Sequence, residues 1–119
     1  MNLLKETKSE LKEHGKSLKD IKWVGCDEFT IPLENFVTCA DMGYDDGYGA
    51  QEVAIDLVVV GDNWWLERHE YDGCEWWEYK ELPHKPSKGK HVERVIGDMW
   101  VSLEEMNKGG DTEWFGHGY

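Results

Sequence analysis

The sequence predicts an α+β domain: a mostly antiparallel sheet of four or five strands, with an N-terminal helix and one or two further helices covering one face. Two patterns support this class. Apolar residues with helical spacing occur in short stretches, and runs of β-branched or alternating residues separated by turn signals occur between them. A chain of 119 residues is long enough for one core, so we expect a single domain over residues 1–108 and a flexible glycine-rich tail over residues 109–119.

Three segments are predicted to be helical. Residues 2–14 carry Leu4 and Leu11 one heptad apart and are followed by Gly15, a typical C-terminal cap, with a short capping turn over residues 17–20. A second helix is expected after Pro32, and its apolar residues follow a core-facing period: Leu33, Phe36, Val37 and Ala40. Residues 100–106 are predicted to form a last short helix with Ser102 near its start.

The predicted strands lie between these helices. Short strands are expected over residues 21–24 and 29–31, and the β-branched run 53–60 is expected to be the central strand. Two longer strands, residues 64–71 and 74–82, flank Asp72-Gly73, which is a strong two-residue hairpin signal. Residues 41–50 are predicted to be a loop, and the basic segment 83–97 a second loop that ends in a strand over residues 91–96.

A two-residue turn at Asp72-Gly73 fixes which hairpin residues share a face. It places Glu67 opposite Glu78 and His69 opposite Trp76, and alternation then separates two sets of side chains. The set assigned to the core is Trp64, Leu66, Trp77 and Tyr79. The other set combines aromatic and acidic residues: Trp65, Glu67, His69, Tyr71, Trp76 and Glu78. A register slip of one residue would reverse this assignment.

The charge distribution constrains the partner. The net charge is −12, and between Asp27 and Glu78 only Arg68 opposes fourteen acidic residues. A field of this sign repels nucleic acid and anionic membranes, so we expect neither as a direct partner and instead expect a basic protein surface. The common alternative is that the acidic residues only keep the protein soluble.

The hairpin is the expected partner-binding surface. Two glutamates opposed across a ladder are destabilising unless a cation compensates them, which His69 or Lys80 could do within the chain and an arginine or lysine could do from a partner. The predicted partner-binding residues are Trp65, Glu67, His69, Tyr71, Trp76 and Glu78, together with Asp45 and Asp46 of the preceding loop. In the alternative interpretation both faces are covered and the glutamates reach the sheet edge.

The motifs for chemistry are weak. Asp41, Asp45 and Glu52 fall at positions 1, 5 and 12 of a calcium loop, but Gly43 and Asp46 stand where the geometry requires a ligand and a glycine. Zinc-ligand spacings are absent from the sequence. A nucleophilic pair of Cys74 and His69 would lie diagonally across the hairpin without an evident oxyanion hole. We therefore expect no metal, no cofactor and no enzymatic activity.

The strings YDDGYGAQEVAIDLVVVGDNWWLERHEYDGCEWWEY and GDMWVSLEEMN resemble those of small uncharacterised proteins encoded by phages and integrative elements of Firmicute bacteria. The resemblance covers residues 3–107 and implies no catalytic residue, since the group has no established activity. It does imply a mobile-element context, in which small acidic proteins inhibit host nucleases as DNA mimics. Anti-restriction and anti-CRISPR proteins belong to this class.

The leading hypothesis is therefore a phage interaction protein that binds a basic host protein, such as a defence nuclease. The alternative is a small-molecule binder that stacks a nucleobase-type ligand on its aromatic sheet face. Three widely spaced cysteines without an apolar signal-peptide core are typical of a reduced protein in the bacterial cytoplasm. An edge strand beside exposed aromatic residues would also permit a homodimer.

Overall fold

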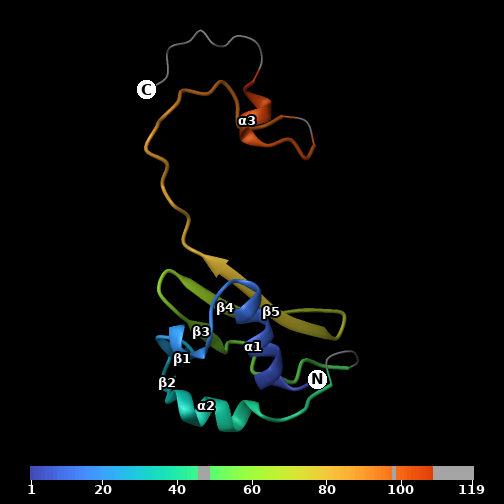
Figure 1. Cartoon of the computed structure of the whole chain (residues 1–119). Helices are drawn as coiled ribbons and strands as arrows, with labels where there is room; N and C mark the ends of the chain where they lie inside the picture. The colour runs from blue at the N-terminus through green and yellow to red at the C-terminus, as the bar shows by residue number, and fades with distance from the viewer. Residues whose placement is uncertain (46–48, 98, 109–119) are drawn as a thin grey trace. The chain divides into compact units, whose positions relative to one another are not determined.

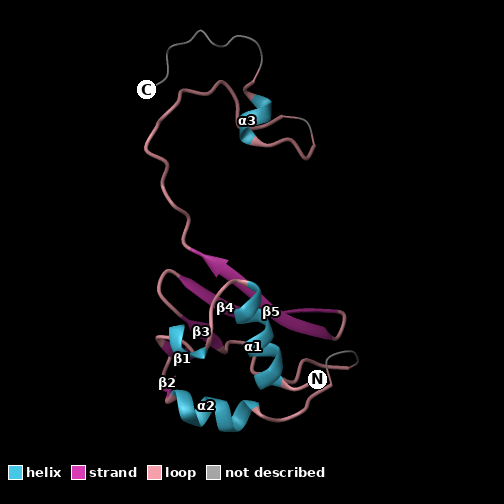
Figure 2. Cartoon of the chain, viewed as in Figure 1, coloured by secondary structure: helices cyan, strands magenta, loops and turns pink. Residues whose placement is uncertain are grey.

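The structure, a computed structural model, describes residues 1–45, 49–97 and 99–108. It confirms the α+β class: within the described residues, five strands form one antiparallel sheet in the order β2-β1-β3-β4-β5 (Figures 1 and 2). The elements are α1 (Leu3–Glu13), the 3₁₀ turn η1 (Leu18–Asp20), β1 (Trp23–Gly25), β2 (Thr30–Ile31), α2 (Leu33–Ala40), β3 (Val58–Val60), β4 (Trp64–Tyr71), β5 (Cys74–Glu81) and α3 (Leu103–Met106).

The residues at both ends of α1 and at the start of α2 are those that the sequence predicts. The Asn2 side chain accepts a hydrogen bond from the Lys5 amide at 2.9 Å and caps α1, and Gly15 leaves the helix with a φ of 73°. A capping box of Ser17 and Asp20 caps the start of η1, as expected. Pro32 directly precedes α2, as the sequence predicts.

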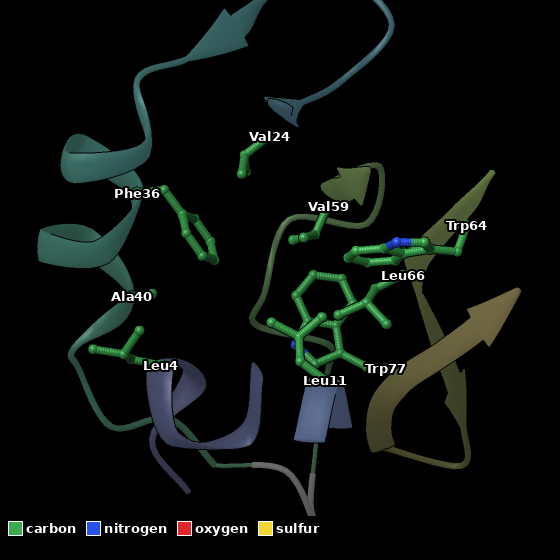
Figure 3. Close-up of a cluster of buried hydrophobic side chains, with 9 residues drawn as sticks. All are labelled: Leu4, Leu11, Val24, Phe36, Ala40, Val59, Trp64, Leu66 and Trp77. Atoms are coloured by element: carbon green, nitrogen blue, oxygen red, sulfur yellow. The ribbon is translucent and has the colours of Figure 1, made fainter. Parts of the chain in front are cut away.

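Both helices cover the same face of the sheet. The core cluster joins one side chain each from β1, β3 and β5 and two from β4 to α1 and α2, so alternate strand residues point toward the helices (Figure 3). Its buried members are Leu4, Leu11, Val24, Phe36, Ala40, Val59, Trp64, Leu66 and Trp77. This layer contains the predicted core residues of the hairpin, with Tyr79 partly buried against it.

The hairpin has the predicted register. Asp72 and Gly73 both have positive φ, 54° and 88°, as a type I′ turn requires, and the strands pair from Tyr71 opposite Cys74 outward. Glu67 therefore lies opposite Glu78. Because the register is fixed, the separation of the hairpin side chains into a covered and an uncovered set is also confirmed.

A buried arginine connects the hairpin to α1. The Arg68 side chain is fully buried, and its guanidinium donates hydrogen bonds to Glu75 at 2.8 Å, Glu6 at 3.2 Å and the Tyr44 hydroxyl at 3.2 Å. It also lies 4.8 Å from the centre of the Trp77 ring. Burial opposes the charged form, but the hydrogen bonds to Glu75 and Tyr44 and the charge of Glu6 outweigh it and raise the Arg68 pKa.

This ion pair also holds the segment that follows α2. The second carboxylate oxygen of Glu75 accepts hydrogen bonds from the amides of Glu52 at 2.7 Å and Val53 at 3.4 Å. Tyr44 donates a hydrogen bond from its hydroxyl to Glu6. Three segments distant in sequence, α1, the loop before β3 and the hairpin, therefore meet at Arg68.

The prediction of a long central strand over residues 53–60 is wrong in its extent. β3 is central but contains only Val58–Val60. The amide of Val53 bonds the Glu75 side chain, and the amide of Leu57 donates to the Ala54 carbonyl in a turn. The chain before β3 therefore satisfies these backbone donors outside the sheet.

Two further segment predictions need correction. The first strand is shifted from residues 21–24 to Trp23–Gly25, because the Ile21 amide closes η1 by bonding the Leu18 carbonyl. The predicted strand over residues 91–96 is absent: the amides of Glu93 and Arg94 bond the Asn107 side chain at 3.0 and 3.2 Å.

The last helix is shorter than predicted and begins later. The Ser102 side chain caps α3 by accepting a hydrogen bond from the Glu105 amide at 3.1 Å. Trp100 has a φ of 58°, which excludes it from a right-handed helix.

The chain divides into two compact units, Met1–Leu82 and Pro83–Tyr119. The predicted domain of residues 1–108 thus extends beyond the first unit, and the predicted tail, residues 109–119, lies outside the described residues. None of the helices in the described part of the chain is long and apolar enough to cross a membrane.

Replacing Arg68 with methionine should lower the free energy of unfolding by about 3–5 kcal/mol, because it leaves the buried Glu75 carboxylate without its cation. Urea denaturation measures this loss. Lys80→Met removes a positive charge from the opposite face of the same hairpin and should cost less than about 1 kcal/mol. Equal losses in both variants would contradict the structural role of Arg68.

Candidate functional site

The sheet face opposite α1 and α2 carries the candidate site. On β4 and β5 the residues that alternate with the buried ones point to this side, and all of them are partly or fully exposed. We call this surface the open face. Its hairpin residues are Trp65, Glu67, His69, Tyr71, Cys74, Trp76, Glu78 and Lys80.

Three residues that the sequence analysis did not assign extend the open face across the sheet. Val60 lies opposite Trp65 on β4 and opposite Trp23 on β1, and Val58 lies opposite Glu67. Trp23 is exposed, at 39%. Alternation along β1 could have indicated that Trp23 lies on the open face. Which residues lie beside it follows only from the β1–β3 register.

The two opposed glutamates are each bound by an indole. The Trp65 Nε1 group donates to Glu67 at 2.8 Å, and the Trp76 Nε1 group donates to Glu78 at 3.2 Å. Each donor lies two residues before its acceptor on the same strand and the same face. The tryptophans therefore fix the carboxylates in addition to presenting apolar surface.

His69 completes the group at Glu67. Its Nε2 atom lies 2.8 Å from the second carboxylate oxygen of Glu67, and its ring stacks on Trp76 with 6.4 Å between centroids. His69 or Lys80 was the predicted internal partner of the glutamates. His69 makes this contact with Glu67, and Lys80 acts on the same carboxylate through its charge.

These contacts favour the ionised form of Glu67. The hydrogen bonds from Trp65 and then His69 lower its pKa below the ordinary value of 4.5. Because the folded protein binds this proton more weakly than the unfolded chain, the stabilisation is present above about pH 4.5 and is lost as the pH falls through the lower folded value. The carboxylate is therefore charged at neutral pH.

The structure brings together six of the eight predicted partner-binding residues, all of them on the open face: Trp65, Glu67, His69, Tyr71, Trp76 and Glu78. Asp45 does not belong to this group. It follows Tyr44, whose hydroxyl contacts Arg68 on the helix-covered side, and its amide lies 3.4 Å from the Glu52 carboxylate. Asp46 lies outside the described residues.

The arrangement gives little support to nucleophilic chemistry at Cys74. Cys74 is exposed beside the turn, while the His69 ring atom Nε2 is directed at Glu67. Activation of a thiol needs the histidine within hydrogen-bond reach of it. The expectation that the protein is not an enzyme stays a prediction.

The acidic loop residues make internal contacts. Asp41 accepts a hydrogen bond from the Asn2 side chain at 3.1 Å.

In the described part of the chain, one group has potential metal-ligand atoms within 4.8 Å of one another: Glu10, Glu13 and His14. His14 is already paired with Glu10 at 3.1 Å and stacked on Tyr79 at 3.8 Å, an arrangement that stabilises the end of α1 without an ion.

Comparison with known proteins gives no relative: no family model, curated protein or solved structure matches the chain.

Replacing Trp65 with phenylalanine should raise the pKa of Glu67 toward 4.5, because the ring stays while the N–H donor is lost. NMR titration of the side-chain carboxyl carbon measures this value. Trp23→Phe changes an indole on the same face that lies on β1, and it should leave the Glu67 pKa unchanged. An unchanged pKa in Trp65→Phe would show that the indole does not stabilise the carboxylate.

Proposed function

We propose that the chain is an interaction protein that binds a basic protein through the open face. One observation carries this proposal. Glu67 lies opposite Glu78, and each carboxylate accepts a hydrogen bond from an indole group. Both lie on a sheet face that neither α1 nor α2 covers. Like charges opposed across a ladder repel each other, and a cation from a partner would add to the compensation that His69 and Lys80 give Glu67 within the chain.

The wider charge distribution supports the same class of partner. The net charge of −12 attracts basic surfaces and repels nucleic acid. Not every carboxylate of the hairpin is available, because Glu75 is buried against Arg68 and Glu70 accepts a hydrogen bond from the Gly73 amide. The available carboxylates of the hairpin therefore form a compact acidic and aromatic patch. They do not form a long row of charges spaced like phosphates.

Within this proposal the partner is a basic nucleic-acid enzyme of a bacterial host cell. This step rests on the proposed phage or mobile-element origin together with the acidic charge. The protein would then act in the host cytoplasm as an inhibitor of a defence nuclease, of the anti-CRISPR or anti-restriction class. It would occupy the surface of the nuclease that otherwise holds DNA.

A second candidate function is the binding of a nucleobase-type ligand. The favouring observation is the stack of His69 on Trp76, with both rings partly exposed on the open face. Such binding would quench tryptophan fluorescence with little dependence on salt, whereas a charge-driven protein complex weakens steeply as salt rises.

The test is recovery of the partner from bacterial lysate at low and high salt, with identification by mass spectrometry. We expect a basic nucleic-acid enzyme that salt removes and that Glu67→Lys/Glu78→Lys fails to recover. Glu13→Lys/Glu34→Lys is the matched control, since it makes the same change in charge at exposed positions of α1 and α2. Equal recovery by both double variants would sink the assignment to the open face.

A further inference from the structure

The centre of the open face has a repeated pattern, and the following inference about it rests on the proposed function. The pattern Trp-x-Glu occurs on both strands, at residues 65–67 of β4 and 76–78 of β5. Since Glu67 pairs with Glu78 in an antiparallel ladder, Trp65 and Trp76 lie at opposite ends of the carboxylate pair. The positions of these four residues on the two strands are therefore related by the local twofold axis of the antiparallel ladder.

The two carboxylates are preorganised as acceptors. Each is held by the indole of its own strand, at 2.8 Å for Glu67 and 3.2 Å for Glu78. A carboxylate has about four acceptor positions, so the indole and imidazole at Glu67, and the indole at Glu78, leave further positions on each group. The side chain of Glu67 is 34% exposed, which keeps these positions accessible from solvent.

We propose that the Glu67–Glu78 pair is a binding site for the guanidinium group of an arginine on the partner. A guanidinium has five N–H donors in one plane, so a single group can donate to both carboxylates. Its flat face can also stack on an indole, and Trp65 and Trp76 offer one at either end of the pair.

The same site discriminates against lysine. An ammonium carries the same charge, but it is a compact and strongly hydrated group that cannot form two parallel hydrogen bonds to a carboxylate and has no flat face to lie against a ring. On a half-exposed surface the Coulomb attraction alone is weak for either cation. The preference for arginine therefore arises from the geometry of the donors and the rings.

Two peptides of equal charge test the inference, hexa-arginine and hexa-lysine, each titrated into the full chain by calorimetry at fixed salt. We expect hexa-arginine to bind with a Kd at least about fivefold lower. The signals of the Trp65 and Trp76 indole N–H groups in NMR spectra should shift with it. In Glu67→Gln/Glu78→Gln, whose amide oxygens still accept from the indoles, the preference should disappear. Glu13→Gln/Glu34→Gln should retain it.

The outcomes separate the two proposals. Equal affinity for both peptides, with both lost in Glu67→Gln/Glu78→Gln, would overturn the guanidinium site and leave the proposed function standing. Binding of both peptides that is insensitive to Glu67→Gln/Glu78→Gln would overturn the guanidinium site and the assignment of the open face together. Circular dichroism of each variant verifies that the fold is retained.

Discussion

The arrangement of the first unit depends on one buried charge. Arg68 is the only cationic side chain among the hairpin residues that point toward the helices, and it is paired with Glu75 from the neighbouring strand and Glu6 from α1. A buried ion pair of this kind stabilises little compared with a well-packed apolar core, but losing one partner leaves an uncompensated charge. It therefore selects one docking of α1 on the sheet, in which Trp77 also donates to Thr7 at 2.9 Å.

Fixing α1 and α2 on one face leaves the other face to solvent. Strand alternation then determines which residues are exposed, so Trp64 and Leu66 enter the core while Trp65 and Glu67 remain outside. Burial of Arg68 with two carboxylates thus removes the main internal cation from the acidic hairpin. What remains on the open face is a pair of opposed glutamates with indole donors, His69 and Lys80, which is the composition of a cation-binding surface.

The hairpin was predictable because its signals are local. Asp72-Gly73 defines the turn, the turn defines the register, and alternation defines both faces. The ion-pair network around Arg68 could not be predicted, because Glu6 and Arg68 are 62 residues apart and nothing in their local sequence connects them. The same limit explains the segments 53–57 and 91–96, whose β-prone residues suggested strands. The amide of Val53 bonds the Glu75 side chain, and the amides of Glu93 and Arg94 bond the Asn107 side chain. These acceptors are distant in sequence, so a local pattern cannot reveal them.

Partner binding at the hairpin requires one covered and one open sheet face, and hydroxyl-radical footprinting of the tryptophans measures this division directly. Trp23 and Trp76, which are 39% and 37% exposed, should oxidise readily, whereas Trp64 and Trp77, at 4% and 3%, should be protected until the protein unfolds. This contrast in the folded protein would establish the open face as an accessible surface. Comparable protection of Trp76 and Trp77 would show that both faces are covered, and the hairpin could then not bind a partner as described.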